Sequence, residues 1–330
     1  MDAEQILVLG HRGLLGAAVL EACQARCQVV EGGRQAFDLT WFGMPPGPLP
    51  AEGEGPPPSQ ARQSLERLLA ELPPLGGGVG ALHSRLDFVR QAIMGRRPRL
   101  VINCAGYTDV DRAEREPELA WAVNARGAQA LARACQEAGS HLVHMSTDYV
   151  FDGASGRPYR EDDPPAPLSA YGRSKLEGER LVRAELPGAL IVRSAWLFGP
   201  GRDGFVEKVV AKARQGQPFG VVRDQMGSPT YTRDLARAIL ELGRRWVGGV
   251  LHVVNQGRAS RWELARQAVR LAGLDPELVQ PVQTAALEQA ARRPAFSVLD
   301  AGRAARLLGG PLPPWLDSLA RHLNGGKEGS

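Results

Sequence analysis

Three glycines at intervals of three residues join an apolar run to a helical segment at the start of the chain. Gln5–Gly10 (QILVLG) is the apolar run, typical of a buried parallel strand, and residues 16–25 repeat apolar residues at helical spacing. Gly10, Gly13 and Gly16 allow a tight turn, a close approach to the backbone and close packing of the helix on the strand. This opening predicts the first strand–helix unit of a nucleotide-binding α/β fold.

Strands and helices continue to alternate as far as residue 194. The alternation predicts a doubly wound parallel sheet of the Rossmann type, because parallel neighbours need a crossover helix. We expect further strands at 27–31, 100–103, 141–146 and 189–194, and helices at 87–94, 117–138 and 170–185. After Trp196 the pattern loosens into a smaller, mostly helical C-terminal part that we expect to cover the strand ends as a substrate cap, with helices at 204–215, 232–242, 260–272 and 314–323.

These patterns indicate two domains. Residues 1–195 form the predicted dinucleotide-binding domain, and residues 196–330 form the predicted substrate-binding cap, in which 224–255 can return toward the sheet. The stretch from about residue 44 to 80 is rich in proline and glycine, which oppose a continuous core element. We therefore expect a surface insertion there.

Composition and charge exclude several other classes of protein. The chain carries 40 Lys and Arg against 36 Asp and Glu, and the basic residues are scattered rather than gathered in a stripe, so we expect no nucleic-acid partner. No apolar run approaches the roughly 18 residues that cross a bilayer. The N-terminus resembles no signal peptide, and we expect a cytoplasmic protein without membrane contact. No cluster of residues indicates a metal site, and the cysteines match no zinc spacing; we expect reduced thiols at Cys23, Cys27, Cys104 and Cys135.

The glycine turn and the helix after it predict a dinucleotide cofactor. A helix N-terminus offers unpaired N–H groups and a partial positive charge to a pyrophosphate. The expected contacts are Gly10, Gly13, Leu14, Leu15 and Gly16.

The end of the second strand is expected to bind the adenosine ribose. Glu31 would accept from a 2′-hydroxyl and favour NAD, whereas Arg34 would pair with a 2′-phosphate and favour NADP. We favour NADPH, with NADH as the alternative, and take Asp38 and Leu39 as the adenine-contacting pair.

Tyr171 and Lys175 are the predicted catalytic pair. Four residues apart on a helix, they lie on one face. An ordinary tyrosine has a pKa of about 10, and a neighbouring ammonium group lowers the pKa of the phenol and can also bind the nicotinamide ribose. Thr147 ends an apolar strand at the edge where doubly wound sheets place their chemistry, so its hydroxyl can share the substrate oxygen with Tyr171.

Seven stretches together resemble the dTDP-4-dehydrorhamnose reductases, a family of extended short-chain dehydrogenases/reductases. Their order and spacing make the resemblance specific, and it covers roughly residues 5–40 and 85–325. The stretches are NCAGYTDVD (103–111), AVNA (122–125), STDYVFDG (146–153), YGRSK (171–175), RSAWLFG (193–199), DQMGSPT (224–230) and ARRP (291–294).

The resemblance implies an activity, which is reduction of dTDP-4-dehydro-L-rhamnose to dTDP-L-rhamnose by NAD(P)H, for cell-surface polysaccharide. It implies that Tyr171 donates the proton, that Lys175 tunes the pKa of Tyr171 and binds the ribose, and that Thr147 polarises the sugar carbonyl. It also implies further cofactor contacts at Ala105, Gly106, Tyr107 and Thr108, and substrate contacts at Thr108, Thr147, Asp148, Trp196 and Arg293.

Two implied roles concern positions outside the catalytic set. Asn124 would hold the backbone around the active site. Arg292 and Arg293 would either face the diphosphate of the substrate or form a structural ion pair.

The sequence departs from the family pattern in two places. Cys104 and Gly106 stand where the family usually has alanines. The insertion follows the adenosine-binding strand, so Asp87 competes with Asp38-Leu39 for the adenine contact. A homodimer is compatible with the sequence, but no residue indicates the magnesium-bridged dimer that some members form.

Two other functions stay open. An enzyme acting on a different NDP-sugar, either a reductase or an epimerase, would use the same fold. A non-catalytic protein resembling the regulatory subunit of methionine adenosyltransferase would bind the cofactor and a partner protein. The intact set of Thr147, Tyr171 and Lys175 favours the reductase.

Overall fold

The computed structural model describes residues 4–10, 13–23, 27–31, 90–91, 93–200 and 204–325. The insertion predicted at 44–80 lies outside these residues, as do Arg34, Asp38, Leu39 and Asp87.

Within the residues that the structure describes, six parallel strands form the central sheet, in the order β10-β5-β4-β3-β1-β2. The order reverses beside β1, which pairs with β2 on one side and β3 on the other, and α/β sheets bind their ligands in the crevice at such a point. The predicted doubly wound fold is confirmed. The strands are β1 (Glu4–Leu9), β2 (Cys27–Glu31), β3 (Leu100–Asn103), β4 (His141–Thr147), β5 (Leu190–Ser194) and β10 (Gly249–His252).

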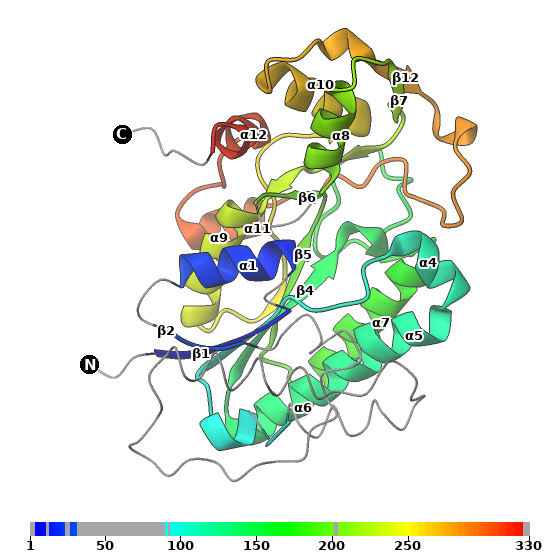
Figure 1. Ribbon diagram of the computed structural model, residues 1–330. Coiled ribbons are helices and arrows are strands. Elements are labelled where there is room, and N and C mark those ends of the chain that lie inside the picture. The colour runs from blue at the N-terminus through cyan, green and yellow to red at the C-terminus, as the bar shows by residue number, and fades with distance from the viewer. Residues whose placement is uncertain are drawn as a thin grey trace, which may run out of the picture.

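Helices cover both faces of the sheet, with α1 (Leu14–Ala22) and α9 (Thr232–Arg244) on one face and α6 (Ala128–Ala138) and α7 (Ala170–Glu185) on the other (Figure 1). Successive side chains of a strand point to opposite faces. Ile6 and Val8 of β1 accordingly join the core under α1 and α9, whereas Leu7 and Leu9 join the core under α6 and α7. Each such fully buried aliphatic side chain contributes about 1.5–3 kcal/mol to folding, which explains why the strands are apolar throughout.

A π-helical turn interrupts the helix that the sequence predicts over 117–138. α5 (Pro117–Trp121) and α6 are α-helical, whereas η2 (Ala122–Gly127) between them has π-helical hydrogen bonding. Such turns insert one extra residue and are frequent at functional sites. The buried Asn124 lies in this turn.

The helix α7 begins and ends where the sequence predicts. Ser169 caps it, and its Oγ accepts from the Gly172 N–H at 3.1 Å. A serine N-cap of this kind is worth about 1 kcal/mol. The cap fixes the first turn of the helix, which carries Tyr171.

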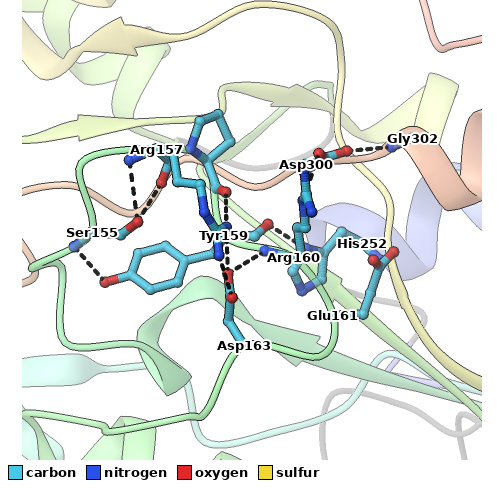
Figure 2. A network of polar contacts seen from close by, with 10 residues as sticks. Ser155, Arg157, Tyr159, Arg160, Glu161, Asp163, His252, Asp300 and Gly302 are labelled. Carbon is cyan, nitrogen blue, oxygen red and sulfur yellow. Dashed lines mark hydrogen bonds and ion pairs between the residues drawn. The ribbon is translucent and has the colours of Figure 1, made fainter.

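The loop that joins η3 (Asp148–Val150) to α7 is held by a polar network (Figure 2). Arg157 binds both carboxylate oxygens of Asp163, at 2.8 and 2.7 Å. The carbonyl oxygen of Tyr159 accepts from the Asp300 N–H at 2.8 Å and lies 3.0 Å from Nδ1 of His252, the last residue of β10. The connection from β4 to α7 is thus fixed both to the sheet and to the C-terminal segment.

The chain after residue 204 contributes to two separate cores. Its helix α9 and strand β10 join the core of the central sheet, and other segments form a second core outside the sheet. α9 packs beside α1, and β10 joins the edge of the sheet next to β5. In the described part of the chain, three two-stranded sheets lie outside the central sheet. Their strands have only two to four residues, too few for an alternating pattern to show in the sequence. The other elements are β6 (Leu197–Phe198), α8 (Phe205–Ala213), β7 (Phe219–Val222), β8 (Met226–Gly227), β9 (Thr230–Tyr231), β11 (Ala259–Ser260), α10 (Arg261–Leu271), η4 (Pro276–Leu278), β12 (Val279–Val282), η5 (Thr284–Ala286), α11 (Gly302–Leu308) and α12 (Trp315–Leu323).

In Figure 1, α8, α10, β7 and β12 lie beyond one end of the central sheet. The division into domains at residues 195 and 196 stays a prediction. Among the residues that the structure describes, no helix is long and apolar enough to span a bilayer.

Candidate active site

A cavity of about 790 Å³ opens at the carboxyl ends of β1, β3, β4 and β5. The glycine turn and α1 form one part of its wall, and the start of α7 and the segment after β5 form others. The lining residues are 10, 13–15, 104–110, 112, 119, 123, 145–149, 171, 175, 194–197 and 261.

The glycine turn approaches the neighbouring strand closely. Gly10 has φ +75°, and a Cβ on it would lie 2.7 Å from the Ala105 nitrogen, so no other residue fits there without a shift. The Gly13 N–H donates to the Gly10 carbonyl at 2.9 Å and closes the turn. Gly13 then begins α1 without a side-chain cap, which leaves the first N–H groups of the helix available to an anion.

The segment after β3, which the glycine turn contacts at Ala105, is held by Asn124. Its Oδ1 accepts from the Tyr107 N–H at 2.8 Å, and its Nδ2 donates to the Tyr107 carbonyl at 3.0 Å and to Ser174 Oγ at 2.9 Å. A Cβ on Gly106 would meet the same Oδ1 at 3.0 Å. The implied role of Asn124 in holding the backbone thus has a direct geometric basis.

The glycine turn and the segment after β3 together fit a nicotinamide dinucleotide. A Cβ at Gly10 would collide with the adjoining strand end, so the turn can remain tight only with glycine there, and the uncapped end of α1 suits a pyrophosphate. The thiol of Cys104 also lines the cavity, and burial raises its pKa to about 12, so it is unreactive at neutral pH.

Tyr171 and Lys175 line the cavity from one face of α7, with only 9% and 5% of each residue exposed. The Lys175 ammonium donates to the Met145 carbonyl at 2.6 Å. Burial lowers the pKa of Lys175 to about 8, an effect that the negative charge of Glu179 opposes.

The pKa of Tyr171 moves in the direction opposite to the one expected. Burial raises it above its ordinary value, while a hydrogen bond with Thr147 works in the other direction and the charge of Asp148 adds to the rise. The expected lowering of the pKa by Lys175 is wrong, because desolvation of the phenolate dominates and Lys175 is not among the groups that shift it. Tyr171 is consequently protonated at neutral pH.

Thr147 and Asp148 are joined to each other at the end of β4. The Thr147 hydroxyl donates to Asp148 Oδ1 at 3.1 Å, and the Ser297 hydroxyl donates to Asp148 Oδ2 at 2.6 Å. Burial raises the pKa of Asp148 to about 6, and these two hydrogen bonds limit the rise. Thr147 also accepts from the Tyr149 N–H at 3.2 Å, which fixes the position of its hydroxyl.

Glu179 lies one helical turn after Lys175 and is buried. Arg193 of β5 binds both of its carboxylate oxygens, at 2.9 and 2.7 Å, and the Ser146 hydroxyl donates to it as well. The face of α7 therefore presents a phenol, an ammonium group and a carboxylate in succession, at Tyr171, Lys175 and Glu179.

The side of the cavity nearest the C-terminal segment is formed by Trp196 and Arg261. Trp196 adopts φ +48°, unusual for a residue with a side chain, and its indole packs directly on Gly227. The Arg261 guanidinium lies over the indole, 3.7 Å from the ring centroid. A bulky residue in this conformation persists only where its surroundings hold it, and such strain is frequent at ligand sites.

Comparisons with known proteins identify the chain. The profile of the family described as RmlD substrate binding domain matches residues 82–327. The dTDP-4-dehydrorhamnose reductase of Streptomyces griseus is 44% identical over 249 residues, which cover 71% of this chain and 82% of the relative. The chain belongs to the dTDP-4-dehydrorhamnose reductase family.

Two further relatives show how far this family likeness extends. The probable dTDP-4,6-dihydroxy-2-methyloxan-3-one 4-ketoreductase of Streptomyces antibioticus is 42% identical over 262 residues, 78% of this chain and 89% of the relative. The crystal structure of the Bacillus anthracis dTDP-4-dehydrorhamnose reductase in complex with NADP superposes with a TM-score of 0.80 at 30% identity, covering 97% of this chain and 99% of that one. The predicted family is confirmed.

Most of the described residues that the glycine turn, the catalytic pair and the family resemblance predict for the site line one cavity. Gly16 does not line it, because it is buried within α1. Arg293 does not line it either, because it pairs with Asp111. The residues that do are Gly10, Gly13, Leu14, Leu15, Ala105, Gly106, Tyr107, Thr108, Thr147, Asp148, Tyr171, Lys175 and Trp196.

Sequence reasoning missed two prominent residues of the cavity. Tyr149 belongs to the STDYVFDG stretch and packs edge-on against Tyr171, with ring centroids 5.6 Å apart, so its place in the motif was an available signal. Arg261 follows the cap serine of α10 and carries no motif that would have singled it out.

Proposed function

We propose that this protein reduces the 4-keto group of dTDP-4-dehydro-L-rhamnose to give dTDP-L-rhamnose, with NADPH or NADH as the reductant. The observation that carries the proposal is the meeting of Tyr171, Lys175 and Thr147 on the wall of the cavity that also contains the glycine turn. Membership of the reductase family supports the choice of substrate.

Tyr171 provides the proton of the reaction. A nicotinamide dinucleotide held by the glycine turn would supply the hydride for the carbonyl carbon, and the phenol of Tyr171 would give its proton to the carbonyl oxygen. Because burial raises the pKa of Tyr171, the phenol is fully protonated before each turnover. The ammonium group of Lys175, on the same face of α7, stabilises the phenolate that remains and can bind the ribose hydroxyls.

Thr147 orients the carbonyl that is reduced. Its hydroxyl, fixed between Asp148 and the Tyr149 N–H, can turn toward a substrate oxygen shared with Tyr171 and stabilise the charge that develops there. Trp196 lines the same cavity and can contact the sugar there, beside the Arg261 guanidinium that lies over its indole. For Arg293 we favour the structural ion pair over the contact with the diphosphate, because Asp111 holds its guanidinium.

Oxidation of NADPH with enzymatically generated dTDP-4-dehydro-L-rhamnose tests the proposal. The expected result is loss of the absorbance of reduced nicotinamide, one NADPH for each sugar reduced, with dTDP-L-rhamnose as the product. An epimerase would change the sugar without net oxidation of NADPH, and a non-catalytic subunit would bind NADPH and leave the sugar unchanged. Turnover with a different dTDP-keto-sugar only would replace the substrate and keep the reductase.

Three other predictions accompany this function. They are a cytoplasmic location, the compatibility with a homodimer, and the cofactor contacts of Arg34 and Asp38-Leu39. Gel filtration with light scattering shows whether the protein is a homodimer. Comparison of NADPH with NADH as reductant, for the wild type and Arg34→Ala, measures the preference that Arg34 is expected to set.

A further inference from the structure

Arg261 is a partly buried cation that faces the cavity from the N-terminal turn of α10. Its guanidinium lies 3.7 Å from the centroid of Trp196 and 5.2 Å from that of Phe205. Two aromatic rings therefore fix the plane of the guanidinium. Guanidinium–ring contacts stabilise the charge but leave the N–H donors at its edge available.

The other cations of the cavity are engaged. Of the described residues that line it, Arg112, Lys175 and Arg261 carry a positive charge. Arg112 pairs with Glu116, Nε to Oε1 at 2.9 Å, and Lys175 donates to the Met145 carbonyl beside Tyr171. No carboxylate of the described part of the chain lies within ion-pair distance of Arg261.

Tyr149, which also hydrogen-bonds to Arg261, and Asp148 are the acidic groups that most influence Arg261, and the phenol of Tyr149 is uncharged at neutral pH because burial raises its pKa. Asp148 contributes to the electrostatic field at Arg261, but its two oxygens accept from the hydroxyls of Thr147 and Ser297. A guanidinium partly removed from water without an ion-pair partner is costly. An anionic ligand in the cavity would offset that cost.

We propose that Arg261 binds the diphosphate of the nucleotide-sugar substrate, with Trp196 holding its guanidinium in the orientation needed. The inference rests on the proposed function, which supplies a ligand with two linked phosphates. The planar fork of arginine donates two parallel N–H bonds to phosphate oxygens, a match that neither Lys175 nor the paired Arg112 offers. Arg261 comes from the start of α10, whereas Tyr171 and Thr147 come from α7 and β4, so the diphosphate and the sugar carbonyl would contact different elements of the cavity lining.

The test compares binding of dTDP with binding of thymidine, by isothermal titration calorimetry. The variants are Arg261→Met and Arg261→Lys, and the matched control is Arg266→Met. Arg266 lies on the same helix and also faces a tryptophan ring, that of Trp262 at 5.2 Å, but it pairs with Glu277 away from the cavity. NADPH binding to each variant reports whether the fold is intact.

Arg261→Met should weaken dTDP binding by roughly 10- to 100-fold, since hydrogen bonds to a charged group are worth about 1.5–3 kcal/mol. Thymidine and NADPH binding should be unchanged, Arg261→Lys should be intermediate, and Arg266→Met should match the wild type.

Three results would overturn the inference. They are unchanged dTDP affinity in Arg261→Met, an equal loss for thymidine and dTDP, and a loss of NADPH binding that Arg261→Lys does not restore. If the wild type binds UDP and not dTDP, the proposed substrate is wrong. The same variants are then compared with UDP and uridine in place of dTDP and thymidine. If the wild type binds no nucleoside diphosphate, both the proposed function and the inference fall.

Discussion

Arg293 binds both carboxylate oxygens of Asp111, Nη2 to Oδ2 at 2.5 Å and Nη1 to Oδ1 at 3.1 Å. The Ala291 N–H donates to the same carboxylate at 3.0 Å. The pair joins α4 (Val110–Arg115) to a segment of irregular backbone 180 residues later in the chain. Two stretches of the family pattern, NCAGYTDVD and ARRP, are thus connected to each other.

Breaking this pair should lower stability and should leave substrate affinity nearly unchanged. With 37% of the Asp111 side chain exposed, we expect a loss of only about 1 kcal/mol for Arg293→Met or Asp111→Asn, and the double variant should lose little more than either alone. Urea unfolding of the three variants measures this. A large rise in KM for the nucleotide sugar in Arg293→Met, at unchanged stability, would return Arg293 to the substrate site.

Tyr171→Phe should lower kcat by about 10²- to 10⁴-fold, because it removes the proton donor and keeps the ring. Binding of NADPH should stay within about threefold of the wild type, since only the chemical step loses an interaction. The matched control is Tyr159→Phe, whose hydroxyl bonds to Asp152 away from the cavity and should not affect kcat. Stopped-flow oxidation of NADPH and fluorescence titration provide the two measurements. Near-normal turnover of Tyr171→Phe would exclude Tyr171 as the donor.

The value of kcat/KM for NADPH should fall as the pH rises through about 8. Lys175 has its pKa lowered to about 8 by burial, so it is charged below that pH and neutral above it, and only the charged form binds the ribose and stabilises the phenolate. The profile of kcat/KM for NADPH against pH measures the titration of the free enzyme. Lys175→Arg, which remains charged, should be slower but lack this alkaline fall; the same fall in that variant would assign the titration to another group.

Glu179→Gln should destabilise the protein by about 3–5 kcal/mol, because it leaves the Arg193 guanidinium buried without its carboxylate. It should also move the alkaline fall to lower pH, since the charge of Glu179 raises the pKa of Lys175. Glu177→Gln is the control on the same helix, because Glu177 makes only a surface pair with Arg180 and should change stability little.

Where Glu179→Gln is too unstable for kinetics, the double variant Glu179→Leu, Arg193→Leu removes both charges and should recover much of the stability. Its alkaline fall should lie below that of the wild type. An unshifted profile would show that Glu179 does not influence Lys175.

The helix α7 could be predicted from the sequence almost residue by residue, because Ser169 caps it and Leu186 ends it, with apolar residues at helical spacing in between. The π-helical turn at 122–127 could not, since one inserted residue barely disturbs the apolar periodicity of a helix of that length. The net pKa of Tyr171 was also inaccessible, because it depends on burial that only the packed cavity determines. Arg261 reaches the cavity through tertiary folding alone, with no local pattern to indicate it.

The path of the chain through α9 and β10 has a consequence for engineering new substrate preference. Trp196 and Arg261 line the same cavity, yet the stretch between them includes β10, which is a strand of the central sheet, and α9, which packs beside α1 on that sheet. Exchanging everything after residue 195 with a relative would therefore replace an edge strand and a covering helix along with the recognition surface. A chimera that keeps α9 and β10 and exchanges only the segments on either side of them would leave the central sheet intact while changing the residues that line the cavity.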